Sequence, residues 1–267
     1  MCGIAGYSLS EESTVDQMLA TQTLLAAISE RGSDAVGYAF RGPDVPLAVH
    51  KQRGGASELL DVLQVPAGVT QALVHVRDYT KGHPSLMANN HPIRHGTVVG
   101  IHNGIIANDE EILARHGFER AEEGMTVDSE AIFALAEKSS SGGAAFEELR
   151  GSMAAAWMDD REPDRLYLVR GMGRPLWIGQ GEHELFFAST RRALELFERY
   201  TSVRLRLREV GEGTLYAISR GRAVTADHFE PDLSFVEERV LPPVRAPEEA
   251  RFCLARLASI VTAATAR

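Results

Sequence analysis

Short apolar segments of strand length, separated by turn-forming residues, fill much of the second half of this chain and constrain its fold. Turn sequences such as Glu162-Pro163-Asp164 and Gly173-Arg174-Pro175 stand between these segments. Helical patterns interrupt the strands without strict alternation, which favours an α+β fold with antiparallel sheets over a doubly wound parallel sheet. The strand segments lie at 152–158, 166–169, 176–178, 185–188, 203–207 and 214–218.

The first half mixes strand and helix patterns in the same way. Residues 1–10 (MCGIAGYSLS) are typical of a strand of small residues, and apolar residues at helical spacing then predict a helix that ends before Arg31-Gly32. Thr14 and Gln17 have the spacing of a capping box at the start of that helix. Further strands are predicted at 35–40, 45–50, 72–76 and 97–102, and helices at 58–63, 128–138, 191–198 and 248–264.

Composition excludes several classes of function. Lys plus Arg number 28 and Asp plus Glu 37, and the net charge of −9 argues against a broad basic surface for nucleic acid. No apolar run reaches the roughly 18 to 20 residues of a membrane-spanning helix. The N-terminus lacks the basic region of a signal peptide, and two cysteines, Cys2 and Cys253, are too few for a disulfide framework. We therefore expect a cytoplasmic protein.

Histidines crowd one region and raise the question of a bound metal ion. His83, His91, His95 and His102 have neither the tight Cys/His spacing nor the His-Glu-x-x-His pattern of a zinc site. The sequence also lacks a phosphate-binding loop of the form GxxxxGK[ST] and a dinucleotide fingerprint. It therefore predicts no metal and no cofactor.

Cys2 is a candidate nucleophile. Removal of Met1, which is common before a small residue, leaves Cys2 with a free α-amine whose ordinary pKa is about 7.7 to 8.0. Such an amine is suited to take the proton of a thiol whose ordinary pKa is about 8.5. Farther along the chain, the side-chain amide of Asn103 and the backbone N–H of Gly104 are donors suited to an oxyanion hole. Asn-Gly is also the commonest dipeptide of a hairpin turn, and the two interpretations stay open.

Ordered sequence blocks give the chain a family resemblance. They are MCGIAGY at 1–7, RGSDAVG at 31–37, HVRDYTKGHPS at 75–85, NNHPI at 89–93, HNGIIAN at 102–108, TVDSEAI at 126–132 and ASTRRALE at 188–195. In this order they resemble the glutaminase domain of class II glutamine amidotransferases, which are N-terminal-nucleophile hydrolases. The blocks are most similar to those of glucosamine-6-phosphate synthase. The resemblance implies a four-layer αββα sandwich of two antiparallel sheets.

The resemblance also implies roles for individual residues near the nucleophile. Cys2 attacks the side-chain amide carbon of glutamine, and its own α-amine carries the proton. Asn103 and Gly104 hold the developing oxyanion. Arg31 and Asp34 hold the loop beside the nucleophile. Ammonia leaves, and water hydrolyses the resulting γ-glutamyl thioester.

The charged groups of glutamine need partners of their own. By resemblance, Arg77 clamps the α-carboxylate, for which the planar guanidinium is suited, and Asp128 receives the α-ammonium. Asp128 also stands at a predicted helix start, so a helix-capping role is the alternative. Thr80 and Gly82 belong to the same substrate-binding loop.

Two charged residues, Asp78 and Lys81, depart from the family pattern. Where the relatives have Arg-Trp-Ala-Thr-His-Gly, this chain has RDYTKG at 77–82. The carboxylate of Asp78 is expected to pair with Arg77 and weaken glutamine binding if it faces the pocket. Lys81 places an ammonium group in the same loop. These departures leave open whether the substrate is glutamine or another γ-glutamyl amide.

We expect an amidotransferase domain at 2–222 and a C-terminal tail at 223–267 with a docking helix. The apolar stripe of that helix either packs against its own domain or docks on another chain. Because the tail is too short for a synthase domain, the expected function is a glutaminase that supplies ammonia to an acceptor enzyme on a separate chain. The alternatives are a standalone amidohydrolase for another γ-glutamyl amide and a catalytically silent regulatory protein. The oligomeric state stays open.

Overall fold

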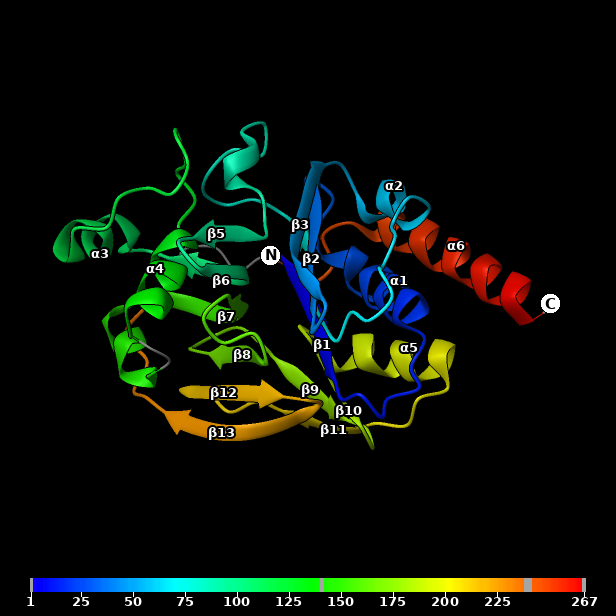
Figure 1. Ribbon diagram of the computed structural model, residues 1–267. Coiled ribbons are helices and arrows are strands. Elements are labelled where there is room, and N and C mark those ends of the chain that lie inside the picture. Colours follow the sequence, from blue (N-terminus) through cyan, green and yellow to red (C-terminus); the bar gives the residue numbers. More distant parts are fainter. Residues whose placement is uncertain (1, 140–141, 238–241, 266–267) are drawn as a thin grey trace.

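Two antiparallel sheets stack on each other in the computed structural model, which describes residues 2–139, 142–237 and 242–265 (Figure 1). The first sheet has the strand order β11 (Arg206–Glu209), β9 (Trp177–Gln180), β10 (Glu184–Ala188), β1 (Gly3–Leu9), β4 (Gln71–Arg77), β2 (Ala35–Gly42) and β3 (Val45–Arg53). The second has the order β13 (Arg222–His228), β12 (Thr214–Ser219), β8 (Arg165–Arg170), β7 (Gly151–Asp159), β6 (Val98–Ile106) and β5 (Ile93–His95).

Helices cover the outer face of each sheet and complete the four layers (Figure 1). On the first sheet lie α1 (Gln17–Ile28), α2 (Ala56–Leu60), α5 (Arg191–Thr201) and α6 (Pro247–Thr265). On the second lie α3 (Asp109–His116) and α4 (Glu130–Ser139). Short 3-10 helices are η1 (Ser29–Arg31), η2 (Met87–Asn89) and η3 (Gly143–Glu148). The predicted α+β fold with an αββα order of layers is confirmed.

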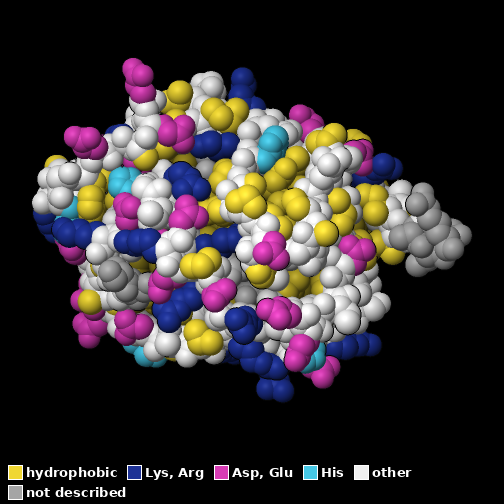
Figure 2. Space-filling view, in the orientation of Figure 1, with side chains coloured by type: hydrophobic (Ala, Val, Ile, Leu, Met, Phe, Trp, Pro, Cys, Tyr) yellow, Lys and Arg dark blue, Asp and Glu magenta, His cyan; other side chains and the backbone are white. Residues whose placement is uncertain are grey.

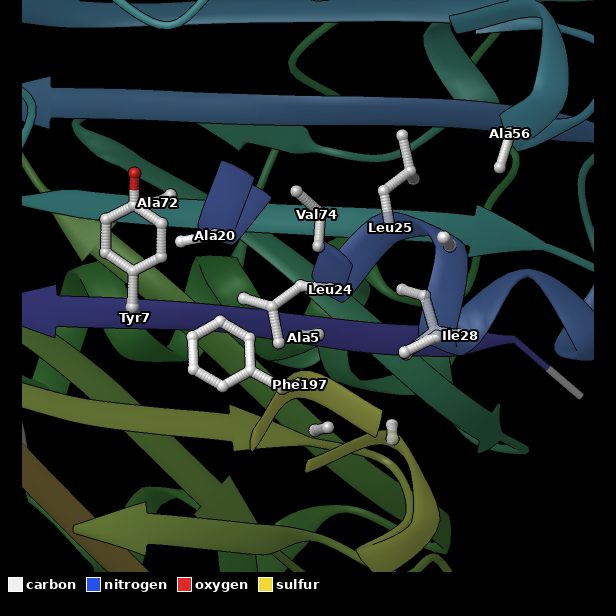
Figure 3. Close-up of a cluster of buried hydrophobic side chains, with 14 of the residues drawn as sticks. Ala5, Tyr7, Ala20, Leu24, Leu25, Ile28, Ala56, Ala72, Val74 and Phe197 are labelled. Atoms are coloured by element: carbon white, nitrogen blue, oxygen red, sulfur yellow. The ribbon is translucent and has the colours of Figure 1, made fainter. Parts of the chain in front are cut away.

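Strand β1 shows why its residues are small and apolar throughout. Successive side chains of a strand point to opposite faces, so Ile4 packs between the two sheets while Ala5 and Tyr7 face the helices. On the helix side, Leu24 of α1 and Phe197 of α5 complete the same buried cluster (Figure 3). Because both faces of β1 are covered, this strand is rigid, and it fixes the position of Cys2 at its start.

Helix α1 starts later than predicted. Its N-cap is Asp16, whose Oδ1 accepts a hydrogen bond of 3.0 Å from the backbone N–H of Leu19. The capping box predicted for Thr14 and Gln17 is therefore wrong. The Asp16 carboxylate directly satisfies a backbone donor in the first turn, and Gln17 is itself the first helical residue.

The C-terminal part of the chain packs on the first sheet and also contributes to the second. Strand β13 pairs with β12 through His228, so the sheet extends past residue 222, where the tail was predicted to begin. In α6, Cys253 and Leu257 are buried in the cluster that contains α1, while Phe252 is 60% exposed. The distal turns of α6 project beyond α1 and α2 (Figure 1). The boundary at residue 222 and a docking role for α6 stay predictions.

The surface offers no broad patch of one charge on the face shown in Figure 2. Lys and Arg side chains alternate there with Asp and Glu side chains, mainly over the part of the molecule that holds the second sheet. Within the described ranges, no helix is long and apolar enough to cross a membrane.

Candidate active site

Residues from five distant segments line one small cavity near the start of β1. Cys2 precedes β1, Arg77 ends β4, Thr80 lies in the loop after β4, Gly104 lies in β6, and Asp128 precedes α4. The structure thus brings together five of the residues singled out from the sequence. The remaining lining residues are Tyr79, Lys81, His91, His102, Val127 and Ser129.

Four other predicted residues do not line this cavity, and three of them contact residues that do. Arg31 donates from Nε to the backbone carbonyl of Cys2 at 3.2 Å. Asp34 accepts from the backbone N–H of Tyr79 at 2.9 Å, and the carbonyl of Gly82 accepts from Arg77 Nη2. A larger hollow, lined by residues around 14–19, 182–184 and 201–204, contains none of the predicted residues.

The Cys2 thiol is held on one side by the backbone that directly follows β4, the neighbour of β1 in the first sheet. Its Sγ donates to the carbonyl of Asp78 at 3.7 Å. Burial raises the pKa of the thiol above its ordinary value, and the charge of Arg77 only partly opposes this. The resting side chain is therefore a neutral thiol that needs a base to become a nucleophile.

Strand β6 carries the Asn-Gly pair in mid-strand. Asn103 pairs with Ala154 and Gly104 with Met153 of β7, so the alternative of a hairpin turn at this dipeptide is wrong. A Cβ on Gly104 would lie 1.9 Å from the carbonyl oxygen of Ser152, which leaves no room for a side chain. The close approach of β7 explains why a glycine is needed here.

Asn103 is a fully buried amide without a hydrogen-bond partner among the described residues. Its side chain is 0% exposed, and neither Oδ1 nor Nδ2 has a partner. Alternation along β6 places it with Val99 and Ile101, on the face that looks toward the first sheet. Cys2 shares the corresponding face of the first sheet with Ile4. A buried amide costs free energy when it is unsatisfied, so Asn103 is not explained by stability.

Arg77 is 2% exposed and organises the loop that follows β4. Nη1 donates to Asn90 Oδ1 at 2.6 Å, and Nη2 donates to the carbonyl of Lys81 at 2.9 Å and to that of Gly82. Burial lowers the pKa of Arg77, while the charges of Cys2 and Asp128 oppose that change. An arginine remains cationic under these conditions, so the guanidinium supplies a fixed positive charge at the cavity.

Asp128 supplies the opposite charge. It is 3% exposed, and its Oδ2 accepts from the backbone N–H of Ile106 in β6 at 2.8 Å. Burial raises the pKa of Asp128 to about 6, and the nearby charge of Asp109 adds to this. The carboxylate is thus poised to be stabilised by a cation that enters the cavity.

The two departures from the family pattern form ion pairs. Asp78 Oδ2 accepts from Nε of Arg245 in the C-terminal segment at 2.9 Å, and Asp78 does not line the cavity. Lys81 Nζ lies 2.6 Å from Asp109 Oδ2 at the start of α3. Both charges are therefore compensated by partners that local sequence patterns did not indicate.

A buried group of histidines borders the cavity and was missed as a group by the sequence analysis. The rings of His75 and His91 stack with centroids 4.3 Å apart, and His102 Nδ1 lies 2.8 Å from Ser129 Oγ. Burial lowers the pKa of His75 and His102 to about 3 and that of His91 well below its ordinary value. The three imidazoles are neutral at neutral pH. Within the described part of the chain, no group of three or more metal-binding side chains is arranged for an ion.

Comparison with known proteins identifies related sequences. Residues 76–196 match the glutamine amidotransferase domain family. The chain is 34% identical over 204 residues to the glutamine–fructose-6-phosphate aminotransferase (isomerizing) of Thermococcus kodakarensis, covering 71% of this chain and 32% of that protein. It is 34% identical over 211 residues to the enzyme of the same name from Symbiobacterium thermophilum, covering 76% and 34%. The chain therefore spans about a third of the length of these relatives.

Solved structures give the same fold. The glutamine phosphoribosylpyrophosphate amidotransferase of B. subtilis, complexed with ADP and GMP, superposes with a TM-score of 0.67 at 18% identity. The match covers 85% of this chain and 49% of that one. A structure described as the allosteric regulatory enzyme of purine biosynthesis matches with a TM-score of 0.66 at 19% identity, covering 85% and 49%.

Proposed function

Because this chain belongs to the class II glutamine amidotransferases, we propose that it hydrolyses the side-chain amide of glutamine through a thioester on Cys2. Attack of the thiolate on the amide carbon forms a C–S bond, and the C–N bond then breaks to release ammonia. Water cleaves the thioester to glutamate and restores the thiol. The observation that carries the proposal is the single cavity that Cys2 shares with Arg77, Gly104 and Asp128.

The α-amine of Cys2, exposed by removal of Met1, acts as the base. The thiol is partly buried and its pKa is raised, so its proton must be removed before attack. His91 and His102 line the cavity, but their lowered pKa values make them poor proton acceptors at neutral pH. The amine takes the thiol proton and gives it to the departing ammonia.

The cavity offers complementary charges for the two ends of the amino acid. Arg77 binds the α-carboxylate and Asp128 the α-ammonium, while the amide reaches toward Cys2 and Gly104. Asp78 forms an ion pair with Arg245, and Lys81 forms one with Asp109. These pairs compensate the two unusual charges and leave the charges that would bind glutamine in place. They therefore support glutamine as the substrate. We assign the ammonia to an acceptor site outside the matched region, since the relatives extend well beyond it.

The affinity for glutamine should depend on pH through Asp128. Its pKa is about 6 in the free protein, and only the ionised form attracts the α-ammonium. Below pH 6 the affinity of a Cys2→Ala variant, measured by calorimetry, should fall, and the decrease should approach about tenfold per pH unit. Adding Asp128→Asn should give weak binding that no longer changes between pH 5 and 7. Constant affinity of the Cys2→Ala variant across this range would contradict the assignment.

An intact mass spectrum after exposure to a diazo-ketone analogue of glutamine tests the proposed function. The expected result is loss of Met1 and one covalent adduct, which is absent from the Cys2→Ala variant. Free glutamine should protect against the adduct. An unmodified protein that has lost Met1, with no ammonia released from glutamine, would contradict glutaminase activity of the isolated chain.

A further inference from the structure

The segment Pro243–Ala246, here called the strap, contacts the two residues that hold Cys2. Arg31 Nη1 donates to the carbonyl of Pro243 at 3.2 Å, while Arg31 Nε donates to the carbonyl of Cys2 at 3.2 Å. Arg245 Nε pairs with the Asp78 carboxylate at 2.9 Å, while the Asp78 carbonyl accepts from the Cys2 thiol at 3.7 Å. The strap thus contacts both Arg31 and Asp78, each of which forms a hydrogen bond with Cys2.

The strap also forms backbone hydrogen bonds that hold it in place. The backbone N–H groups of Arg245 and Ala246 both donate to the carbonyl of Glu30, at 2.8 and 2.9 Å. Helix α6 begins at the next residue and is fixed to the first sheet by the buried Cys253 and Leu257. These contacts fix the position of the strap, which therefore does not depend on the ion pair between Arg245 and Asp78 alone.

The ion pair is only partly shielded from solvent. The side chain of Arg245 is 34% exposed and that of Asp78 is 18% exposed. A pair of this kind contributes little to global stability, because water and salt screen it. Its effect is expected to be local, on the orientation of the Asp78 peptide group that faces the thiol.

We infer that Arg245 is a positioning residue for Cys2, acting through Asp78. This inference rests on the proposed function and adds to it a regulatory point at the C-terminal segment. A chain or ligand that draws Arg245 away from Asp78 would change the reactivity of the nucleophile without entering the cavity. Arg245 lies 167 residues from Asp78 in the sequence, so no local motif indicates this contact.

The test compares Arg245→Ala with Arg256→Ala in the full chain. Arg256 also links the C-terminal part of the chain to the body, through an exposed ion pair with Asp61, but away from Cys2. Arg245→Ala should lower kcat for glutamine hydrolysis about fivefold and change KM by less than about twofold. Arg245→Lys should recover at least about half of the activity, and Arg256→Ala should leave it unchanged.

A double-mutant cycle shows whether the effect runs through Asp78. Asp78→Asn keeps the carbonyl that accepts from the thiol, and it should lower kcat at least as much as Arg245→Ala. The double variant should show no further loss. Additive losses, or an Arg245→Ala variant with wild-type kcat, would overturn the inference.

A second readout is independent of glutamine chemistry. The rate of Cys2 alkylation by iodoacetamide, measured by mass spectrometry, should change with Arg245→Ala and not with Arg256→Ala. If the wild-type chain releases no ammonia, the proposed glutaminase function fails, while this alkylation rate still tests the strap. Equal alkylation rates in all variants would refute a positioning role.

Discussion

Replacing Cys2 by alanine should abolish glutamine hydrolysis and leave a folded protein. The nucleophile is the group that forms the thioester, so kcat should fall by at least about 10⁴-fold. Among the described residues, the hydrogen bond of the Cys2 side chain is a long one, 3.7 Å from Sγ to the Asp78 carbonyl, so its loss removes little stabilising energy. Ammonia release from glutamine measures the first effect, and thermal unfolding measures the second.

The chain supplies a matched control for this variant. Cys253, the other cysteine, is buried in α6, and burial raises the pKa of its thiol to about 12. Cys253→Ala should retain wild-type kcat. Cys2→Ser, which keeps a weaker nucleophile at the same place, should retain a trace of activity. Substantial turnover by Cys2→Ala would show that the reaction does not use an N-terminal cysteine nucleophile.

Asn103→Ala should lower activity without lowering the stability of the protein. If Nδ2 donates to the oxyanion, its loss should lower kcat about 10²- to 10³-fold. The amide now lies buried with no partner among the described residues, which is an energetic cost of about 1 to 3 kcal/mol in a typical protein. Removing it relieves that cost, so the midpoint of thermal unfolding should not fall even though activity does.

Asn90→Ala provides the comparison. This asparagine is equally buried, but its Oδ1 accepts from Arg77 and its Nδ2 donates to the carbonyl of Pro84. Its loss leaves buried partners unpaired, and the midpoint of thermal unfolding should fall. A large loss of stability in Asn103→Ala with little change in kcat would mean that Asn103 is structural.

Much of the architecture could be predicted because it rests on local patterns. Apolar segments of strand length and turn residues predicted antiparallel sheets, while the αββα layers were implied by the resemblance to class II glutamine amidotransferases. The boundaries were less accurate. Strand β6 continues through Asn103 and Gly104, where the dipeptide itself favours a turn. Pairing with β7 over the whole of β6 outweighs that preference. This pairing joins segments that are far apart in the sequence, so a local pattern does not predict it.

The sequence by itself determined which residues carry reactive or charged groups: a cysteine at position 2, Arg77, Asp128 and the Asn103-Gly104 pair. The roles of these residues stay predictions. Only the tertiary structure decided which of them share a cavity and what compensates the unusual charge of Asp78. The physical reason is distance along the chain. Burial and ion pairing depend on segments that meet after folding, and Arg245 reaches Asp78 only because α6 packs on the first sheet.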